Sequence, residues 1–78
     1  MMRIYPVSWR KVVRALVKLG FKPIRQRGSH LILKRKDGKV TVVPIHSREE
    51  IGRGLLRRIA YDAGMTLHEF FEVVIKDP

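Results

Sequence analysis

The residue types that could carry out chemistry in this 78-residue chain are three histidines, His30, His46 and His68. Their spacing does not match the HxxxH pattern of a helical metal site, and the chain has no cysteine that could complete a zinc site or act as a thiolate nucleophile. No serine and aspartate are placed to form a Ser-His-Asp arrangement with them. We therefore expect no metal and no cofactor, and a chemistry that depends on one histidine and its neighbours.

His30 differs from the other two because it follows Gly28-Ser29 and lies among basic residues. Imidazole titrates near neutral pH and can accept the proton of an RNA 2′-hydroxyl, while adjacent cations can hold the phosphate and stabilise its developing charge. These residue types are sufficient for metal-free RNA cleavage, although taken alone they fit a surface histidine in a plain binding domain better. The basic residues around His30 are Arg25, Arg27, Lys34 and Arg35.

The net charge of +10, with a sequence pI of about 11.0, indicates an anionic polymer as partner. Thirteen of the seventeen Lys and Arg residues, but only one of the seven acidic residues, lie in the first 48 positions. The basic surface should therefore belong to the first helix and the sheet, with a merely solvated face as the alternative. The residues that we expect to contact RNA are Arg10, Lys11, Arg14, Arg25, Arg27, Lys34 and Arg35.

The alternating pattern of residues 28–44 predicts a β-hairpin with His30 at a strand end. Asp37-Gly38 suits a two-residue type I′ turn, since glycine, and less easily aspartate, tolerates the positive φ that this turn needs. With that loop, Leu33 pairs with Val42 on the core face of the sheet. Side chains alternate along a strand, so the other face is expected to carry His30, Ile32 and Lys34 beside Thr41, Val43 and Ile45.

Helices are expected before and after this hairpin. Ser8 suits the N-cap of a helix that ends near Leu19, and residues 24–27 are expected to form a short edge strand. A second helix is expected from about residue 55 to residue 63, and Thr66 opens a third through a capping box.

This order of elements predicts a single domain over residues 1–78 with a two-layer α+β fold, in which the helices cover one face of a three-stranded antiparallel sheet. The other face is left bare. A cluster of exposed apolar side chains suggests an interaction surface, either for a partner protein or for a second copy of the chain in a homodimer. The residues of this expected partner surface are Ile32, Val43 and Ile45.

The sequence shows no sign of a membrane or an oxidising compartment. No segment approaches the roughly 18 apolar residues of a membrane span, and the first residues lack the continuous apolar run of a signal peptide. The lack of cysteine gives no disulfide framework. We expect a cytoplasmic protein without a membrane partner.

Three motifs follow one another along the chain: GSH before the basic hairpin, VVPIH at residues 42–46, and LLRRIAYDAGMTLHEF at residues 55–70. In this order they resemble the HicA-like family of small toxins, also described as YcfA-like. The resemblance implies an αβββα(α) fold similar to that of double-stranded-RNA-binding domains. It also implies an endoribonuclease toxin, or mRNA interferase, that acts on mRNA and has a HicB-like antitoxin as partner.

Carried over to this sequence, the resemblance makes His30 the catalytic residue, with Gly28 and Ser29 shaping its approach to RNA. His46 stands where the family often has a Pro-x-His residue, so it is a candidate assisting residue. The expected strand alternation nevertheless points His46 away from His30. The alternative function is a non-catalytic double-stranded-RNA-binding module, because the charge and the order of elements fit that class too.

Overall fold

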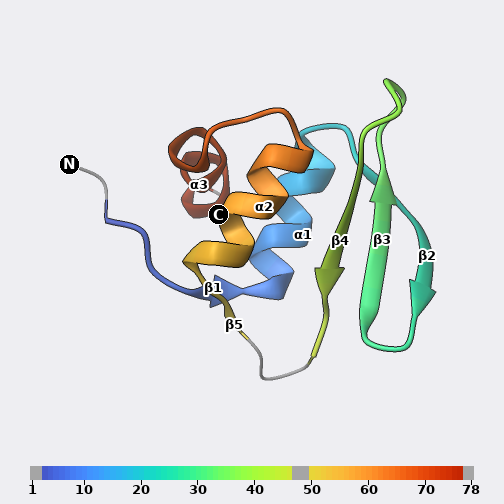
Figure 1. Ribbon diagram of the computed structural model, residues 1–78, viewed down its shortest axis with the longest axis horizontal. Coiled ribbons are helices and arrows are strands. Elements are labelled where there is room, and N and C mark those ends of the chain that lie inside the picture. Colours follow the sequence, from blue (N-terminus) through green and yellow to red (C-terminus); the bar gives the residue numbers. More distant parts are fainter. Residues whose placement is uncertain (1–2, 47–49, 77–78) are drawn as a thin grey trace.

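Three helices lie on one side of a three-stranded antiparallel sheet in the computed structural model, which describes residues 3–46 and 50–76 (Figure 1). This is the predicted α+β fold, similar to that of double-stranded-RNA-binding domains. The sheet order is β2-β3-β4, so β3 is central and β2 lies farthest from the helices. The main elements are α1 (Trp9–Lys18), β2 (Lys22–Arg27), β3 (His30–Lys34), β4 (Val40–Pro44), α2 (Arg53–Asp62) and α3 (Leu67–Ile75).

The helices begin and end where local side-chain chemistry favours it. The Ser8 hydroxyl accepts a hydrogen bond from the backbone N–H of Arg10, which caps α1. At the other end of α1, Gly20 has φ 95° and the N–H of Phe21 donates to the carbonyl of Leu16 at 2.9 Å, as in a Schellman ending. A reciprocal capping box opens α3 at Thr66. These predicted helix ends are confirmed.

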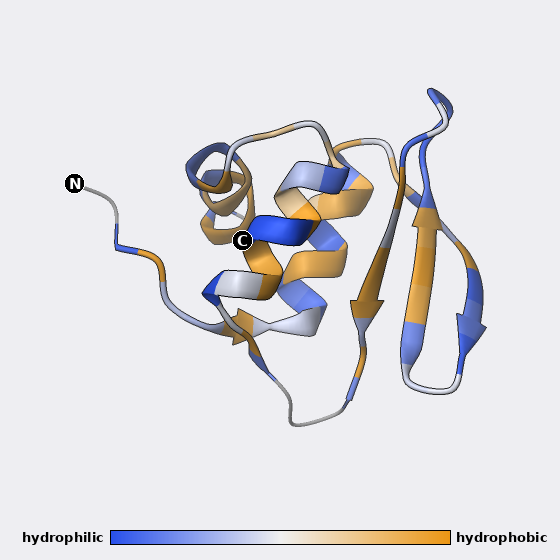
Figure 2. Cartoon of the chain, viewed as in Figure 1, coloured by the Kyte–Doolittle hydropathy of each residue, from blue (hydrophilic) through white to orange (hydrophobic). Residues whose placement is uncertain are grey.

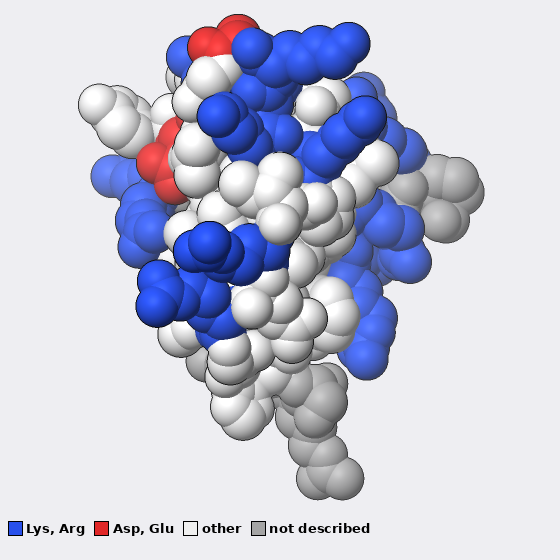
Figure 3. Space-filling model, turned by 90° about the vertical axis from the view of Figure 1, so that its right-hand side faces the viewer, with Lys and Arg blue, Asp and Glu red and all other residues white. Residues whose placement is uncertain are grey.

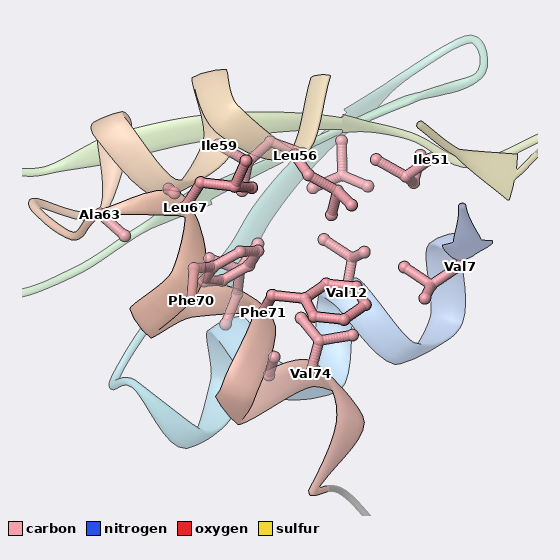
Figure 4. Close-up of a cluster of buried hydrophobic side chains, with 14 of the residues drawn as sticks. Val7, Val12, Ile51, Leu56, Ile59, Ala63, Leu67, Phe70, Phe71 and Val74 are labelled. Atoms are coloured by element: carbon pink, nitrogen blue, oxygen red, sulfur yellow. The ribbon is translucent and has the colours of Figure 1, made fainter. Parts of the chain in front are cut away.

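The hydrophobic core lies between the three helices and the inner face of β3 and β4. Figure 2 shows apolar residues along β3 and β4 and on the inner side of the helices, whereas the end of β2 and the tip of the β3–β4 hairpin are hydrophilic. Phe70 and Phe71 of α3 are fully buried and point toward α1 and α2 (Figure 4). All six residues of β2 are exposed, so this strand is held by backbone pairing to β3 rather than by burial.

The register between β3 and β4 differs from the predicted one by a single residue. His30 lies opposite Pro44, and Leu33 lies opposite Thr41. The cause is a loop of three residues instead of two: Gly38 N–H donates to the Arg35 carbonyl and Arg35 N–H to the Lys39 carbonyl, both at 2.9 Å. With Gly38 at φ 94°, this is the type I turn followed by a left-handed residue that is typical of three-residue hairpins.

The shift exchanges the two faces of β4, as a one-residue slip must. Thr41 and Val43 point inward and are 1% and 0% exposed. Thr41 donates a hydrogen bond from Oγ1 to Oδ2 of Asp62 in α2 at 2.9 Å. Ile45 packs against the core and is only partly exposed. The predicted partner surface is therefore wrong for Val43 and Ile45, and only Ile32 of that set remains on the outer face.

A second, two-stranded sheet was not predicted. It pairs β1 (Val7–Ser8) with β5 (Glu50–Ile51), next to the start of α1 and of α2 (Figure 1). Strands of two residues are too short for an alternating pattern to be visible in a sequence. Val7 and Ile51 both point into the core (Figure 4), so this small sheet closes one end of it.

Candidate active site

A two-residue turn positions His30. Gly28 and Ser29 form the turn between β2 and β3, which is closed by the pair of Arg27 and His30. Gly28 has φ 58°, a conformation that suits glycine at the first central position of a type II′ turn. The GSH motif thus has a simple structural meaning: glycine and serine reverse the chain, and histidine is the first residue of β3. The side chain of His30 is exposed.

His30 lies on the sheet face that points away from the helices, which we call the open face. Its neighbour directly across on β2 is Arg27, and Arg25 lies opposite Ile32 in the same way. Arginines thus occupy the β2 side of this face and apolar residues the β4 side. Figure 3 shows Lys and Arg gathered around an uncharged area on this side of the molecule. The open face consists of Lys22, Arg25, Arg27, His30, Ile32, Lys34, Val40, Val42 and Pro44.

Arg35, which the sequence analysis expects to contact RNA, does not lie on the open face with His30. Its guanidinium stacks over the ring of Phe21 at 4.8 Å, and its Nη1 donates to the carbonyl of Leu19 at 3.1 Å. Nε and Nη2 donate to the two carboxylate oxygens of Asp37 at 3.1 and 3.0 Å. The hydrogen bond from Arg35 lowers the pKa of Asp37 below its ordinary value. Arg35 is thus paired with the exposed Asp37 and bound to the backbone of Leu19, and it ties the hairpin tip to the end of α1.

The remaining basic candidates form two groups. Arg25, Arg27 and Lys34 lie with His30 on the open face. Arg10, Lys11 and Arg14 are exposed on α1, which packs on the inner side of the sheet. Arg10 stacks over the ring of Trp9 at 4.6 Å. The structure therefore brings only the first group together with His30.

His46 lies near the turn that positions His30. It lines a shallow surface depression together with Gln26, Gly28, Ser29 and Ile45. His46 follows the end of β4 at Pro44, and His30 is not among the residues of this depression, so the prediction that His46 points away from His30 stays a prediction. His68, in the first turn of α3, is exposed and lies on another element.

Gln26 was missed by the sequence reasoning. Its side-chain Nε2 donates to the carbonyl of Gly28 at 3.1 Å, so it braces the turn before His30 and forms part of the depression. The signal that could have found it is local: a polar amide two residues before a turn glycine is well placed for a side-chain to backbone hydrogen bond.

The part of the chain that the structure describes contains neither a metal-binding cluster nor a membrane-spanning helix. Over residues 3–46 and 50–76, no group of three or more His, Asp or Glu side chains is placed to hold a metal ion. Within the same ranges, no helix is long and apolar enough to cross a membrane.

Comparison with protein families decides the class of this protein. A family model described as the HicA toxin of bacterial toxin-antitoxin matches residues 9–65, from the start of α1 to the loop before α3. The chain belongs to the HicA toxin family. No curated protein matches the sequence significantly. Membership in the HicA family makes this protein a toxin of the toxin-antitoxin type and implies an antitoxin partner, and the matched range includes the GSH turn and His30.

Proposed function

We propose that this HicA-family toxin is a metal-independent endoribonuclease, an mRNA interferase of the cytoplasm, in which His30 is the general base. The observation that carries the proposal is the position of His30 on the open face. It is exposed at a strand end, directly across from Arg27, and Lys34 lies on the same face of the same strand. A base is thus placed beside cations that can bind one phosphate.

The chemistry needs these groups, the RNA itself and a proton for the leaving oxygen. His30 accepts the proton of a 2′-hydroxyl as its oxygen attacks the adjacent phosphorus; the O2′–P bond forms, the P–O5′ bond breaks, and the 5′-oxygen takes a proton from water. Arg25 and Arg27 hold the phosphate and stabilise the charge that develops on its oxygens. The products are a 2′,3′-cyclic phosphate and a 5′-hydroxyl. DNA, which lacks the 2′-hydroxyl, is not cleaved by this route.

We propose a HicB-like antitoxin as the partner that family membership implies. An acidic protein that covers the open face would pair with Arg25 and Arg27 and bury the apolar side chains of Ile32, Val42 and Pro44. It would then block RNA from His30. A second copy of the chain in a homodimer is the rival occupant of this face, and RNA affinity that is unchanged by the antitoxin would count against our assignment.

A non-catalytic double-stranded-RNA-binding module remains the second candidate function, because the fold is of that type and α1 presents a separate basic surface. Both functions predict salt-dependent RNA binding, so binding alone does not distinguish them. The two functions are distinguished by RNA cleavage that is lost when His30 is replaced.

The test compares cleavage and gel-shift binding of one RNA by the wild type, His30→Ala and His68→Ala, all with EDTA. His68 is the matched control, since it is an exposed histidine on a different element. We expect His30→Ala to lose cleavage by about 10²–10⁴-fold, the usual contribution of a general base, while its binding is retained. His68→Ala should behave as the wild type. Binding without cleavage by all three proteins would favour the binding module.

A further inference from the structure

We infer that the backbone N–H of Ser29 is a further catalytic group of this site. It donates a hydrogen bond to a phosphate oxygen of the RNA, and the side chain of Gln26 holds it in the right direction. This inference rests on the proposed ribonuclease function and adds to it a donor without charge. Gln26 is a positioning residue in this account, because it acts on the RNA only through the turn.

The central peptide of the turn, between Gly28 and Ser29, is held by a side chain. Gln26 donates from Nε2 to the Gly28 carbonyl at 3.1 Å. The residue after Gln26 is Arg27, which pairs with His30 on the open face. Because successive side chains of a strand point to opposite faces, Gln26 projects from the other face of the sheet. The Gly28 carbonyl is therefore held on the side of the sheet opposite to the side chain of His30.

The Ser29 N–H points the other way. A peptide bond is planar, and no cis peptide bond occurs in the described residues, so the N–H of this peptide is antiparallel to its C=O. With the Gly28 carbonyl on the inner side, the Ser29 N–H is directed to the open face, one residue before His30. None of the backbone hydrogen bonds in the described turns and loops uses this N–H. It is thus available to a ligand that lies beside His30 and Arg27.

The conformation of the turn favours the same orientation. Gly28 has φ 58°, and Ser29 is not among the residues with positive φ, since within the described ranges these are all glycines. Positive φ at the first central position alone is the pattern of a type II′ turn. Flipping the central peptide would give a type I′ turn with positive φ at Ser29, which is unfavourable for a residue with a Cβ. The next carbonyl, that of Ser29, is held by the Ile45 N–H at 2.8 Å.

A fixed neutral donor has a clear use in the proposed reaction. Negative charge grows on the nonbridging oxygens of the phosphate as the O2′–P bond forms, and a preorganised backbone N–H stabilises that charge without having to reorient. Arg27 supplies charge from a flexible side chain, whereas the turn gives the Ser29 N–H one direction. This N–H transfers no proton, so the proton balance of the cleavage step is unchanged.

The test of the donor compares Ser29→Pro with Ser29→Ala, both in EDTA. Both variants lack the hydroxyl, but only proline lacks the N–H. Proline is compatible with the turn, because the second central position of a type II′ turn has φ of about −80°. At saturating RNA, we expect Ser29→Pro to cleave about 10²–10³-fold more slowly than Ser29→Ala, the usual effect of removing one such donor. Circular dichroism and urea unfolding check that both variants fold.

The positioning role of Gln26 is tested by Gln26→Glu and Gln26→Met, which leave Ser29 in place. Neither side chain can donate to the Gly28 carbonyl once the glutamate is ionised. Both variants should lower kcat by about 3–10-fold, as expected for one neutral hydrogen bond, with a smaller change in KM. The matched control is Ile24→Thr, which alters a side chain of the same strand that is 57% exposed and should leave kcat unchanged.

A second readout reports on the donor and not on the stability of the fold. One nonbridging oxygen of the cleaved phosphate is replaced by sulfur, which accepts hydrogen bonds poorly, and the two diastereomers are compared. The wild type and Ile24→Thr should cleave one diastereomer more slowly than the other. This difference should shrink in Ser29→Pro and in both Gln26 variants, because the N–H is then missing or no longer held in place.

The contrary outcomes separate this inference from the proposed function. If folded Ser29→Pro cleaves as fast as Ser29→Ala, the N–H does not serve the RNA, and the inference fails while the proposed function stands. Should Ser29→Pro not fold, the Gln26 variants decide: a kcat and a sulfur effect equal to those of Ile24→Thr would overturn the inference. If the wild type cleaves no RNA in EDTA, the proposed function fails and the inference fails with it.

Discussion

At the scale of single residues, the position of His30 separates its chemistry from the stability of the fold. It is exposed at the first position of β3, and its backbone is held by the Gly28-Ser29 turn and by pairing with Arg27 and Pro44. Substitutions of exposed side chains usually change stability by less than about 0.5 kcal/mol. His30→Ala should therefore unfold at nearly the wild-type free energy, so that a loss of cleavage reports on chemistry alone.

Two arginines near the hairpin should respond to substitution in opposite ways. Arg27→Ala removes a cation from the open face, so the slope of log K against log salt for RNA binding should become shallower by about 0.7–0.9, with unfolding unchanged. Arg35→Ala removes hydrogen bonds to Asp37 and to the carbonyl of Leu19, and should cost about 1–3 kcal/mol of unfolding free energy with the salt slope unchanged. Salt titrations and chemical denaturation of both variants measure this. A shallower slope for Arg35→Ala would mean that it does contact RNA.

The Asp37 carboxylate predicts a pH dependence of stability. Its pKa in the folded protein is lowered by the hydrogen bond from Arg35, so the ionised form favours folding. This contribution is fully present above the ordinary value of 3.8 and is lost as the pH falls through the lower folded pKa. The stability difference between wild type and Asp37→Asn, followed by urea unfolding, should shrink below that pH. A difference that is constant from neutral pH to pH 2 would show that the Arg35 contact adds nothing.

At the scale of elements, the hairpin loop decides which residues of β4 are buried. Val43 is fully buried and Val42, its neighbour, lies on the open face. Val43→Thr puts a hydroxyl into the core and should cost about 1–3 kcal/mol, whereas Val42→Thr should stay within about 0.5 kcal/mol of the wild type. Denaturation of this matched pair tests the register directly. The two-residue loop expected from the sequence requires the opposite order of effects.

The helices could be predicted because their signals are local. The capping hydrogen bonds at Ser8, Gly20 and Thr66 join groups that are within five residues of one another. Short stretches of sequence therefore suffice to predict the ends of α1 and the start of α3. The hairpin loop is different. Asp37-Gly38 fits both a two-residue and a three-residue loop, and the choice depends on distant contacts, such as that of Thr41 with Asp62, 21 residues away.

As with the fold, only the part of the candidate site that depends on local sequence could be predicted. The turn at Gly28 places His30 at an exposed strand end from local rules alone. The structural role of Arg35 could not be seen, because its carbonyl partners on Leu19 and Ala63 lie 16 and 28 residues away in the chain. A basic residue that is bound to carbonyl and carboxylate groups of its own chain has the same sequence signature as one that faces RNA.

At the scale of the whole molecule, the distribution of charge follows the fold. Of the basic residues expected to contact RNA, three lie on the open face with His30 and three lie on α1. The surface viewed in Figure 3 carries many Lys and Arg and few acidic residues. Such a surface suits the phosphate backbone of RNA, whose contacts carry no sequence information. Under the proposed function, the 2′-hydroxyl at the position that His30 reaches then selects the reaction.

The most direct test of this account is the chemistry of the RNA ends that the wild-type protein produces in EDTA. A 2′-hydroxyl attack assisted by His30 predicts a 2′,3′-cyclic phosphate on one product and a 5′-hydroxyl on the other, with cleavage undiminished by the chelator. A substrate with a single 2′-deoxy substitution at the cleaved step should resist. Products with a 3′-hydroxyl and a 5′-phosphate, or cleavage that requires Mg²⁺, would contradict the account, because water rather than the 2′-oxygen would then be the nucleophile.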